Sequence, residues 1–163
     1  MITQLRNPLT KEYYDLKSFV LGDTFPWFRI KNDLDDFSFY NHVLLDRPEM
    51  SGYSRVVSQH LPEFMGVLTD IINHNGIRVN YLLRASVNAI EPLITNPVVS
   101  VDHVDHEFPH QNLIIYLTDA GGATHCEGYT HDPCEDDIIQ FKGMHCHDLP
   151  LNKRRVVFVA TYA

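Results

Sequence analysis

The second half of the chain alternates short apolar runs with turn residues, and this pattern constrains the fold more than any other feature of the sequence. Almost no helical spacing lies between the runs, so turns must join the strands, which favours an antiparallel sandwich or jelly roll over a parallel sheet. We therefore expect a jelly-roll core over about residues 78–163. Its strands are expected at Arg78–Ile90, Val98–Val101, Gln111–Thr118, Asp137–Lys142 and Arg155–Tyr162.

The first 77 residues are less regular and rich in aromatic residues, Pro and Asp. Leu61–Asn73 is the clearest helix, because its apolar residues recur at helical spacing, Pro62 suits a first turn and Gly76 follows as a stop signal. A further helix is expected near Thr10–Phe19, among short strands and turns. This part of the chain is expected to form helical and irregular support for the jelly roll.

Length and composition indicate one domain. The chain has 163 residues, of which 44% are hydrophobic, enough to fill a single core. We therefore expect one α+β, mainly β domain over residues 1–163. The formal net charge of −8 argues against a nucleic-acid partner, because phosphate binding needs clustered Lys and Arg and the basic cluster of the sequence is limited to Lys153–Arg155.

The cysteines and the hydropathy pattern indicate a compartment. Cys126, Cys134 and Cys146 form no CxxC pair, and no apolar leader follows Met1, so we expect a reduced, cytoplasmic protein. No apolar run approaches the length of a membrane span, and no membrane partner is expected. A homodimer is possible, because a jelly roll has exposed edge strands.

A His-Val-Asp triplet carries the first indication of chemistry. His103 and Asp105 lie two residues apart, so in an extended segment their side chains leave the same face and can converge on one ion. Two nitrogens and one carboxylate on one face of a metal form the triad that non-haem Fe(II) oxygenases use. A loop histidine beside a turn-forming Asp is the alternative, because such pairs arise often by chance.

The order of the segments beyond the triplet adds weight to the metal site. The succession over about residues 84–162 resembles the Fe(II)/2-oxoglutarate-dependent oxygenases, specifically the prolyl-4-hydroxylase-like branch that includes small phage and bacterial proteins. The resemblance implies a double-stranded β-helix, with Fe(II), 2-oxoglutarate as cosubstrate and dioxygen. It is carried, after the triplet, by Leu113–Thr118, Gly121–Thr124, Ile138–Phe141, Gly143–His147 and Arg154–Val159.

In that family the HxD motif and a distal histidine bind iron, and by resemblance His103 and Asp105 take the first two roles. His145 and His147 are both candidates for the third, since they lie two residues apart and would face the same side of a strand. His145 is preferred, because the double arginine follows it at the spacing typical of the family. His147 stays the alternative.

The resemblance also implies a pocket for the far carboxylate of 2-oxoglutarate. Tyr116 matches a tyrosine whose hydroxyl meets that carboxylate, although Thr118 stands where the family has Asn and Ala123 replaces an acidic residue. Arg155 is preferred as the carboxylate-binding arginine because it directly precedes an apolar strand, with Arg154 as the alternative. A guanidinium suits this task, since it gives a carboxylate two parallel charge-assisted hydrogen bonds.

Other polar residues are less informative. Arg84 and Asn88 lie in an expected strand, where they either contact substrate or cosubstrate or belong to a solvated face. His110, His125 and His131 are expected to be surface or hydrogen-bonded histidines.

The resemblance implies hydroxylation of a substrate that the sequence does not identify. A protein or peptide side chain such as proline is preferred, and a small molecule is also possible. Two other functions stay open: a cupin-like metalloenzyme that uses no 2-oxoglutarate, and a jelly-roll binding module without catalytic iron. The arginine after the distal histidine favours the oxygenase, because a cupin has no need of it.

Overall fold

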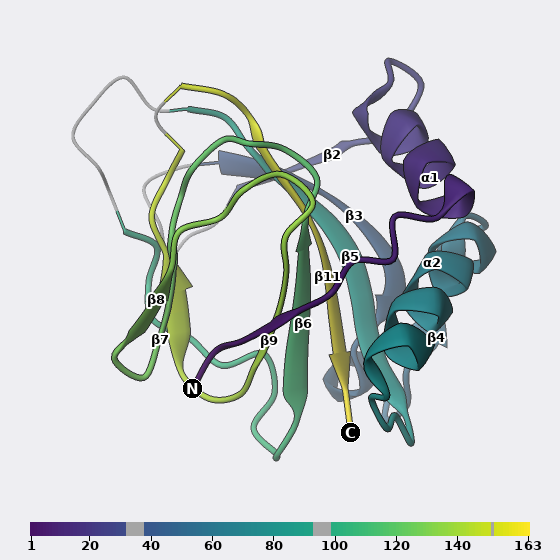
Figure 1. The fold of residues 1–163 in the computed structure, drawn as a ribbon. Helices are drawn as coiled ribbons and strands as arrows, with labels where there is room; N and C mark the ends of the chain where they lie inside the picture. The colour runs from purple at the N-terminus through teal and green to yellow at the C-terminus, as the bar shows by residue number, and fades with distance from the viewer. Residues whose placement is uncertain (32–37, 93–98, 151) are drawn as a thin grey trace.

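The computed structural model describes residues 1–31, 38–92, 99–150 and 152–163, and contains a large and a small antiparallel sheet (Figure 1). The expected double-stranded β-helix, or jelly roll, is confirmed. In spatial order the large sheet consists of β1 (Thr3–Leu5), β9 (Ile138–Phe141), β6 (Gln111–Tyr116), β11 (Arg155–Tyr162), β5 (Leu82–Ile90), β3 (Ser38–Asp46) and β2 (Phe28–Lys31), with β4 (Arg55–Val56) on β3. The small sheet consists of β10 (His145–His147), β7 (Thr124–Cys126) and β8 (Tyr129–His131).

Two helices cover the outer face of the large sheet (Figure 1). α1 (Lys11–Leu21) begins after Thr10, whose hydroxyl accepts a hydrogen bond from the third residue of the helix. α2 (Leu61–Asn75) ends at Gly76, which adopts a left-handed conformation with φ of 62°. Both expected helices are confirmed, each extending two residues further than expected. A single 3₁₀ turn, η1 (Pro48–Met50), follows β3.

The alternation of side chains along β5 and β11 separates a core from a cavity wall. On the outer face, small and apolar residues such as Val87 and Phe158 pack beneath the helices, and the Phe158 ring centre lies 5.0 Å from that of Phe64. The opposite face of the same strands points toward the small sheet and carries most of the polar side chains discussed below.

The expected strands agree with the structure, with shifts at their ends. β6, β9 and β11 form as expected, and β5 begins at Leu82 rather than Arg78. The strand expected at Val98–Val101 does not form over the described part of that range: Val98 lies outside the described residues, and Val99 makes one isolated bridge with Asp148.

The sequence had led us to expect a jelly-roll core within about residues 78–163, but the large sheet extends beyond this range. β1 to β4 come from the first 77 residues, and β3 pairs with β5 along most of its length. This early part of the chain therefore supplies strands as well as supporting helices. Neither helix of the described residues is long and apolar enough to cross a membrane.

Candidate metal centre and anion pocket

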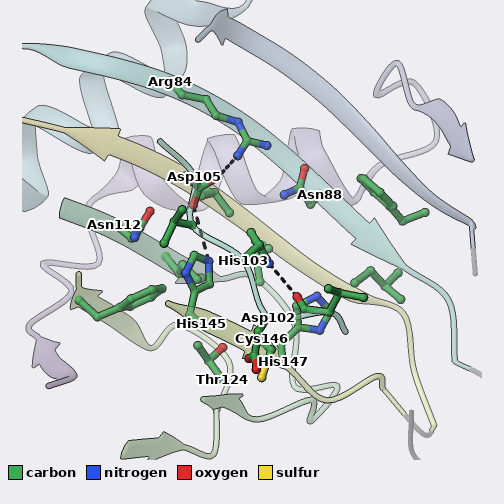
Figure 2. A pocket seen from close by; sticks show the side chains of 18 of the residues that line it. Arg84, Asn88, Asp102, His103, Asp105, Asn112, Thr124, His145, Cys146 and His147 are labelled. Atoms are coloured by element: carbon green, nitrogen blue, oxygen red, sulfur yellow. Dashed lines mark hydrogen bonds and ion pairs between the residues drawn. The ribbon is translucent and has the colours of Figure 1, made fainter. Parts of the chain in front are cut away.

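A cavity of about 460 Å³ lies between the two sheets. Its walls are the inward faces of β5, β6 and β11 on one side and of β7 and β10 on the other, and residues 101–105 line it as well (Figure 2). Every residue preferred from the sequence as a metal ligand lies in this wall, and so does Arg155.

His103, Asp105 and His145 converge in the cavity, with one potential ligand atom from each within 4.8 Å of the others. Nε2 of His145 lies 3.6 Å from Oδ2 of Asp105, and the two imidazole ring centres are 4.4 Å apart. The backbones of the two histidines form a reciprocal pair, each N–H donating to the other carbonyl at 3.0 Å. The structure thus brings together residues that lie far apart in the sequence.

Backbone hydrogen bonds set the tautomer of both imidazoles. Nδ1 of His103 lies 3.0 Å from the carbonyl of Val101, and Nδ1 of His145 lies 3.1 Å from the carbonyl of Gly143. A carbonyl only accepts, so each Nδ1 carries a proton, and in the neutral imidazole Nε2 is then the nitrogen with the lone pair. Burial, together with repulsion from His103, lowers the pKa of His145, which favours the neutral form that binds metals.

Two arginines orient the carboxylate of Asp105, which is 6% exposed. Nη1 of Arg84 donates to Oδ1 at 2.5 Å (Figure 2). Nη2 of Arg47 lies 3.7 Å from the same oxygen, and Nη1 of Arg47 donates to the Asp105 carbonyl. Burial alone would raise the pKa of Asp105, but the charge of Arg84 and the nearby imidazoles outweigh it and leave this pKa below its usual value. Oδ2 therefore stays ionised and directed toward His145.

His147 lies on the same strand but outside this group. Its Nδ1 donates to the carbonyl of Asp148 at 3.1 Å, and its backbone N–H donates to the Ser100 hydroxyl. Burial and the charge of Arg155 lower the pKa of His147 to about 3, so the ring is neutral. Among the described residues, the cluster able to hold a metal contains His145 and not His147.

Arg155 is a buried cation without a carboxylate partner in the described parts of the chain; it is 3% exposed. Its Nε donates to the carbonyl of Gly122 and its Nη2 to the hydroxyl of Thr124, both at 3.3 Å. The Tyr116 hydroxyl lies 2.6 Å from the same Thr124 oxygen. Because an uncompensated buried charge costs several kcal/mol, this arrangement is suited to receiving an anion.

Arg154 points elsewhere. It forms an ion pair with Glu91, in which Nε lies 2.6 Å from the carboxylate, and its guanidinium lies over the Tyr40 ring. Its side chain is 46% exposed. Adjacent residues of an extended chain project to opposite sides, so Arg154 and Arg155 cannot both enter the cavity.

Gly122 makes the close approach of Arg155 possible. Its φ is 80°, and a Cβ at this position would lie 2.7 Å from the carbonyl oxygen of Asp148 and 2.9 Å from Cδ of Arg155.

The two residues that depart from the family pattern, Thr118 and Ala123, have local structural partners. The Thr118 hydroxyl accepts from the backbone N–H of Val156, and the carbonyl of Ala123 accepts from the backbone N–H of Asp148.

Four further polar residues line the cavity. Arg84 and Asn88 are part of its wall, so the alternative of a solvated strand face is wrong for both. The sequence analysis did not identify Arg47 or Asn112 as site residues. The signal available for Asn112 was a polar residue inside the apolar run of β6. His110, His125 and His131 have hydrogen-bond or ion-pair partners outside the metal-ligand cluster: the Phe108 carbonyl, Asp148 with Thr130, and Asp137.

No protein-family model and no curated protein matches the chain. Solved structures match over nearly its whole length. A 2OG-Fe(II) oxygenase family protein from Burkholderia pseudomallei superposes with a TM-score of 0.72 at 14% identity, covering 99% of this chain and 84% of that one.

Two prolyl hydroxylases are also similar. The enzyme from Trichoplax adhaerens, solved with a peptide fragment of hypoxia inducible factor, has a TM-score of 0.61 at 10% identity over 99% of this chain and 82% of its own. A prolyl-4-hydroxylase from Pseudomonas putida has a TM-score of 0.57 at 12% identity over 99% and 91%. The chain therefore has the fold of these oxygenases, which confirms the resemblance noted in the sequence at the level of the fold.

Proposed function

We propose that this protein is an Fe(II)- and 2-oxoglutarate-dependent dioxygenase. One observation carries the proposal: a single cavity contains both a His-Asp-His cluster and a buried guanidinium without a carboxylate partner among the described residues. The first suits a divalent metal, and the second suits the far carboxylate of a dianion that also reaches the metal.

The donor set fits Fe(II). Nε2 of His103, Nε2 of His145 and an ionised oxygen of Asp105 would hold the ion, a set of two nitrogens and one carboxylate that leaves coordination positions for other ligands. When bound, Fe(II) supplies the activation of dioxygen that is coupled to oxidative decarboxylation of 2-oxoglutarate and ends in hydroxylation of a C–H bond.

The surrounding residues keep the ligands in place. The carbonyls of Val101 and Gly143 fix the imidazole tautomers, and Arg84 with Arg47 holds the Asp105 oxygen that faces away from His145. Partners of this kind fix the orientation of metal ligands and commonly change metal affinity by an order of magnitude or more.

Arg155, Tyr116 and Thr124 form the proposed pocket for the far carboxylate. The guanidinium can form two parallel hydrogen bonds with it, and the two hydroxyls can supply further ones. Arg155 is 3% exposed, so water competes little for these bonds. We assign this role to Arg155 rather than Arg154, whose charge Glu91 already neutralises.

The two alternatives have less support. A cupin-like metalloenzyme would call for a further histidine at the metal, and His147 donates its Nδ1 proton to a backbone carbonyl outside the cluster. A binding module without iron would leave the buried charge of Arg155 and the converging His-Asp-His atoms without a purpose.

The similar prolyl hydroxylases support a protein or peptide side chain, such as proline, as the substrate; a small molecule is the other class that the cavity can admit. We also propose a cytoplasmic location, which the free state of all three cysteines supports. The possible homodimer stays a prediction.

The test is an anaerobic titration of the metal-free protein with Fe(II) and 2-oxoglutarate. The expected result is a weak visible metal-to-ligand charge-transfer band that needs both additions, because a keto acid must chelate an open iron site to produce it. Metal binding without the band would support the cupin-like alternative. Absence of metal binding would contradict the proposed iron site altogether.

A further inference from the structure

We infer that the cavity contains a second anion site, formed by Arg84, Arg47 and Asn112, which receives a carboxylate or phosphate group of the substrate. The inference rests on the proposed function and adds a substrate class to it. This site lies beside the metal-ligand cluster, and Arg155 lies elsewhere in the same cavity.

The first observation is a polar stripe on a buried strand. β5 directs Arg84, Ser86 and Asn88 to its inner face, while the residues between them pack beneath the helices. Neither Oγ of Ser86 nor Oδ1 of Asn88 has a hydrogen-bond partner in the described residues. Buried polar groups without partners are uncommon in folded proteins, so such a stripe along a cavity wall indicates contact with a polar ligand.

The second observation is an unpartnered carboxamide in the same cross-strand row. Thr161 of β11 pairs with Arg84 on one side and with Asn112 on the other, so the three side chains leave the same face of the sheet. Asn112 is completely buried, and neither its Nδ2 nor its Oδ1 has a partner within the described residues. Neighbouring strands lie about 5 Å apart, so the Arg84 side chain is long enough to share a ligand with Asn112.

The third observation is a pair of arginines in the cavity wall that keep donors to spare. Arg84 and Arg47 both approach the carboxylate of Asp105. Within the described residues, the hydrogen-bond partner of the Arg84 guanidinium is bound through Nη1. A guanidinium has five N–H donors, so both arginines keep donors for a second anionic group.

The far carboxylate of 2-oxoglutarate does not account for this site. Arg84 pairs with Thr161, six residues along β11 from Arg155, which separates the two backbone positions by about 20 Å. If Arg155 holds the far carboxylate of 2-oxoglutarate, an anion near Arg84 has two sources: the carboxylate at the metal-binding end of the cosubstrate, or the substrate. Testing the site after 2-oxoglutarate has bound separates these two sources.

Inorganic sulfate is a suitable probe, used with protein loaded with Zn(II) and 2-oxoglutarate so that no turnover occurs. Sulfate is titrated at constant ionic strength while NMR follows the Arg Nε–H and Asn Nδ2–H signals. We expect saturable shifts at Arg84 and Asn112. Arg84→Gln should weaken the apparent affinity at least fivefold, and so should Asn112→Leu, which leaves both arginines and Asp105 in place.

Arg154→Gln is the matched control, because Arg154 is a half-exposed arginine that pairs with Glu91, beyond the end of β5 that is remote from Arg84; it should leave sulfate binding unchanged. The inference is overturned if no saturable shift occurs, if the affinity is the same in Arg84→Gln and Asn112→Leu as in the wild type, or if sulfate displaces 2-oxoglutarate. If the zinc protein does not bind 2-oxoglutarate, the proposed function fails. The anion site is then tested by the same sulfate titrations of the wild type and variants loaded with Zn(II) only.

Discussion

The guanidinium carbon of Arg155 lies 5.3 Å from the centre of the Tyr116 ring, and both side chains have Thr124 Oγ1 as a hydrogen-bond partner. The aromatic face compensates part of the buried charge, since a desolvated cation over a ring is worth about 2 kcal/mol. It does not replace an anion. Arg155 is therefore positioned for a ligand by contacts that remain too weak to neutralise it.

Arg155→Gln should reduce the affinity for 2-oxoglutarate by about 10- to 100-fold, because a hydrogen bond to a charged group contributes about 1.5–3 kcal/mol. Isothermal titration of the metal-loaded protein would measure it, with metal affinity followed separately. Arg154→Gln is the matched control and should bind 2-oxoglutarate as the wild type does. A larger loss in Arg154→Gln would reverse our assignment of the two residues.

His145→Ala should abolish tight metal binding, since the remaining His103 and Asp105 offer two ligands. His147→Ala should retain the metal, because His147 lies outside the cluster. Metal content after dialysis and calorimetric titration with Zn(II) would compare the two variants. If His147→Ala lost the metal and His145→Ala retained it, the third ligand would be His147 and our assignment of His145 would be wrong.

Gly122→Ala should destabilise the protein more than Gly121→Ala. Both residues have positive φ, of 80° and 67°, but a Cβ at Gly121 meets no atom within 4 Å, whereas one at Gly122 collides with backbone and with Arg155. The difference in unfolding free energy should be about 1–3 kcal/mol, the usual range for overpacking. Urea denaturation of both variants measures it, and equal losses would show that backbone strain alone matters.

Tyr162→Phe should leave the free energy of unfolding unchanged or raise it slightly. Burial raises the pKa of Tyr162 to about 12, and its hydroxyl has no partner in the described parts of the chain. Tyr13→Phe is the contrasting variant, because the Tyr13 hydroxyl donates to Asp136 at 2.6 Å and its loss should cost about 1.5–3 kcal/mol. Denaturation midpoints of the pair test this, and a marked loss in Tyr162→Phe would reveal a partner for its hydroxyl.

Regular elements were predictable from the sequence where one period continued without interruption. α2 is an example, since it keeps its helical spacing over its length, and β11 was recognised instead as a largely apolar run next to turn residues. β3 was not recognised, because its register shifts between Val43 and Leu45 and both Leu44 and Leu45 are buried, which breaks the alternation. The strands of the small sheet have three residues each, too few to show any period.

The candidate site was predictable in its residue types but not in its choices between neighbours. His145 and His147 have the same parity on one strand, so spacing cannot decide which of them reaches Asp105. The choice between Arg154 and Arg155 depends on which side of β11 faces the cavity, a property of the folded sheet. Arg47 comes from a distant turn, and no local pattern indicates that it contacts Asp105.

The reciprocal backbone pairing of His103 and His145 has a thermodynamic consequence. Because main-chain hydrogen bonds hold the two residues opposite each other, the separation of their imidazoles is fixed when the fold forms. The conformational entropy of bringing two ligands together is then lost during folding rather than during metal capture. The metal-free protein should accordingly present two preorganised imidazole ligands, and the binding free energy of the ion is left to stabilise the whole fold.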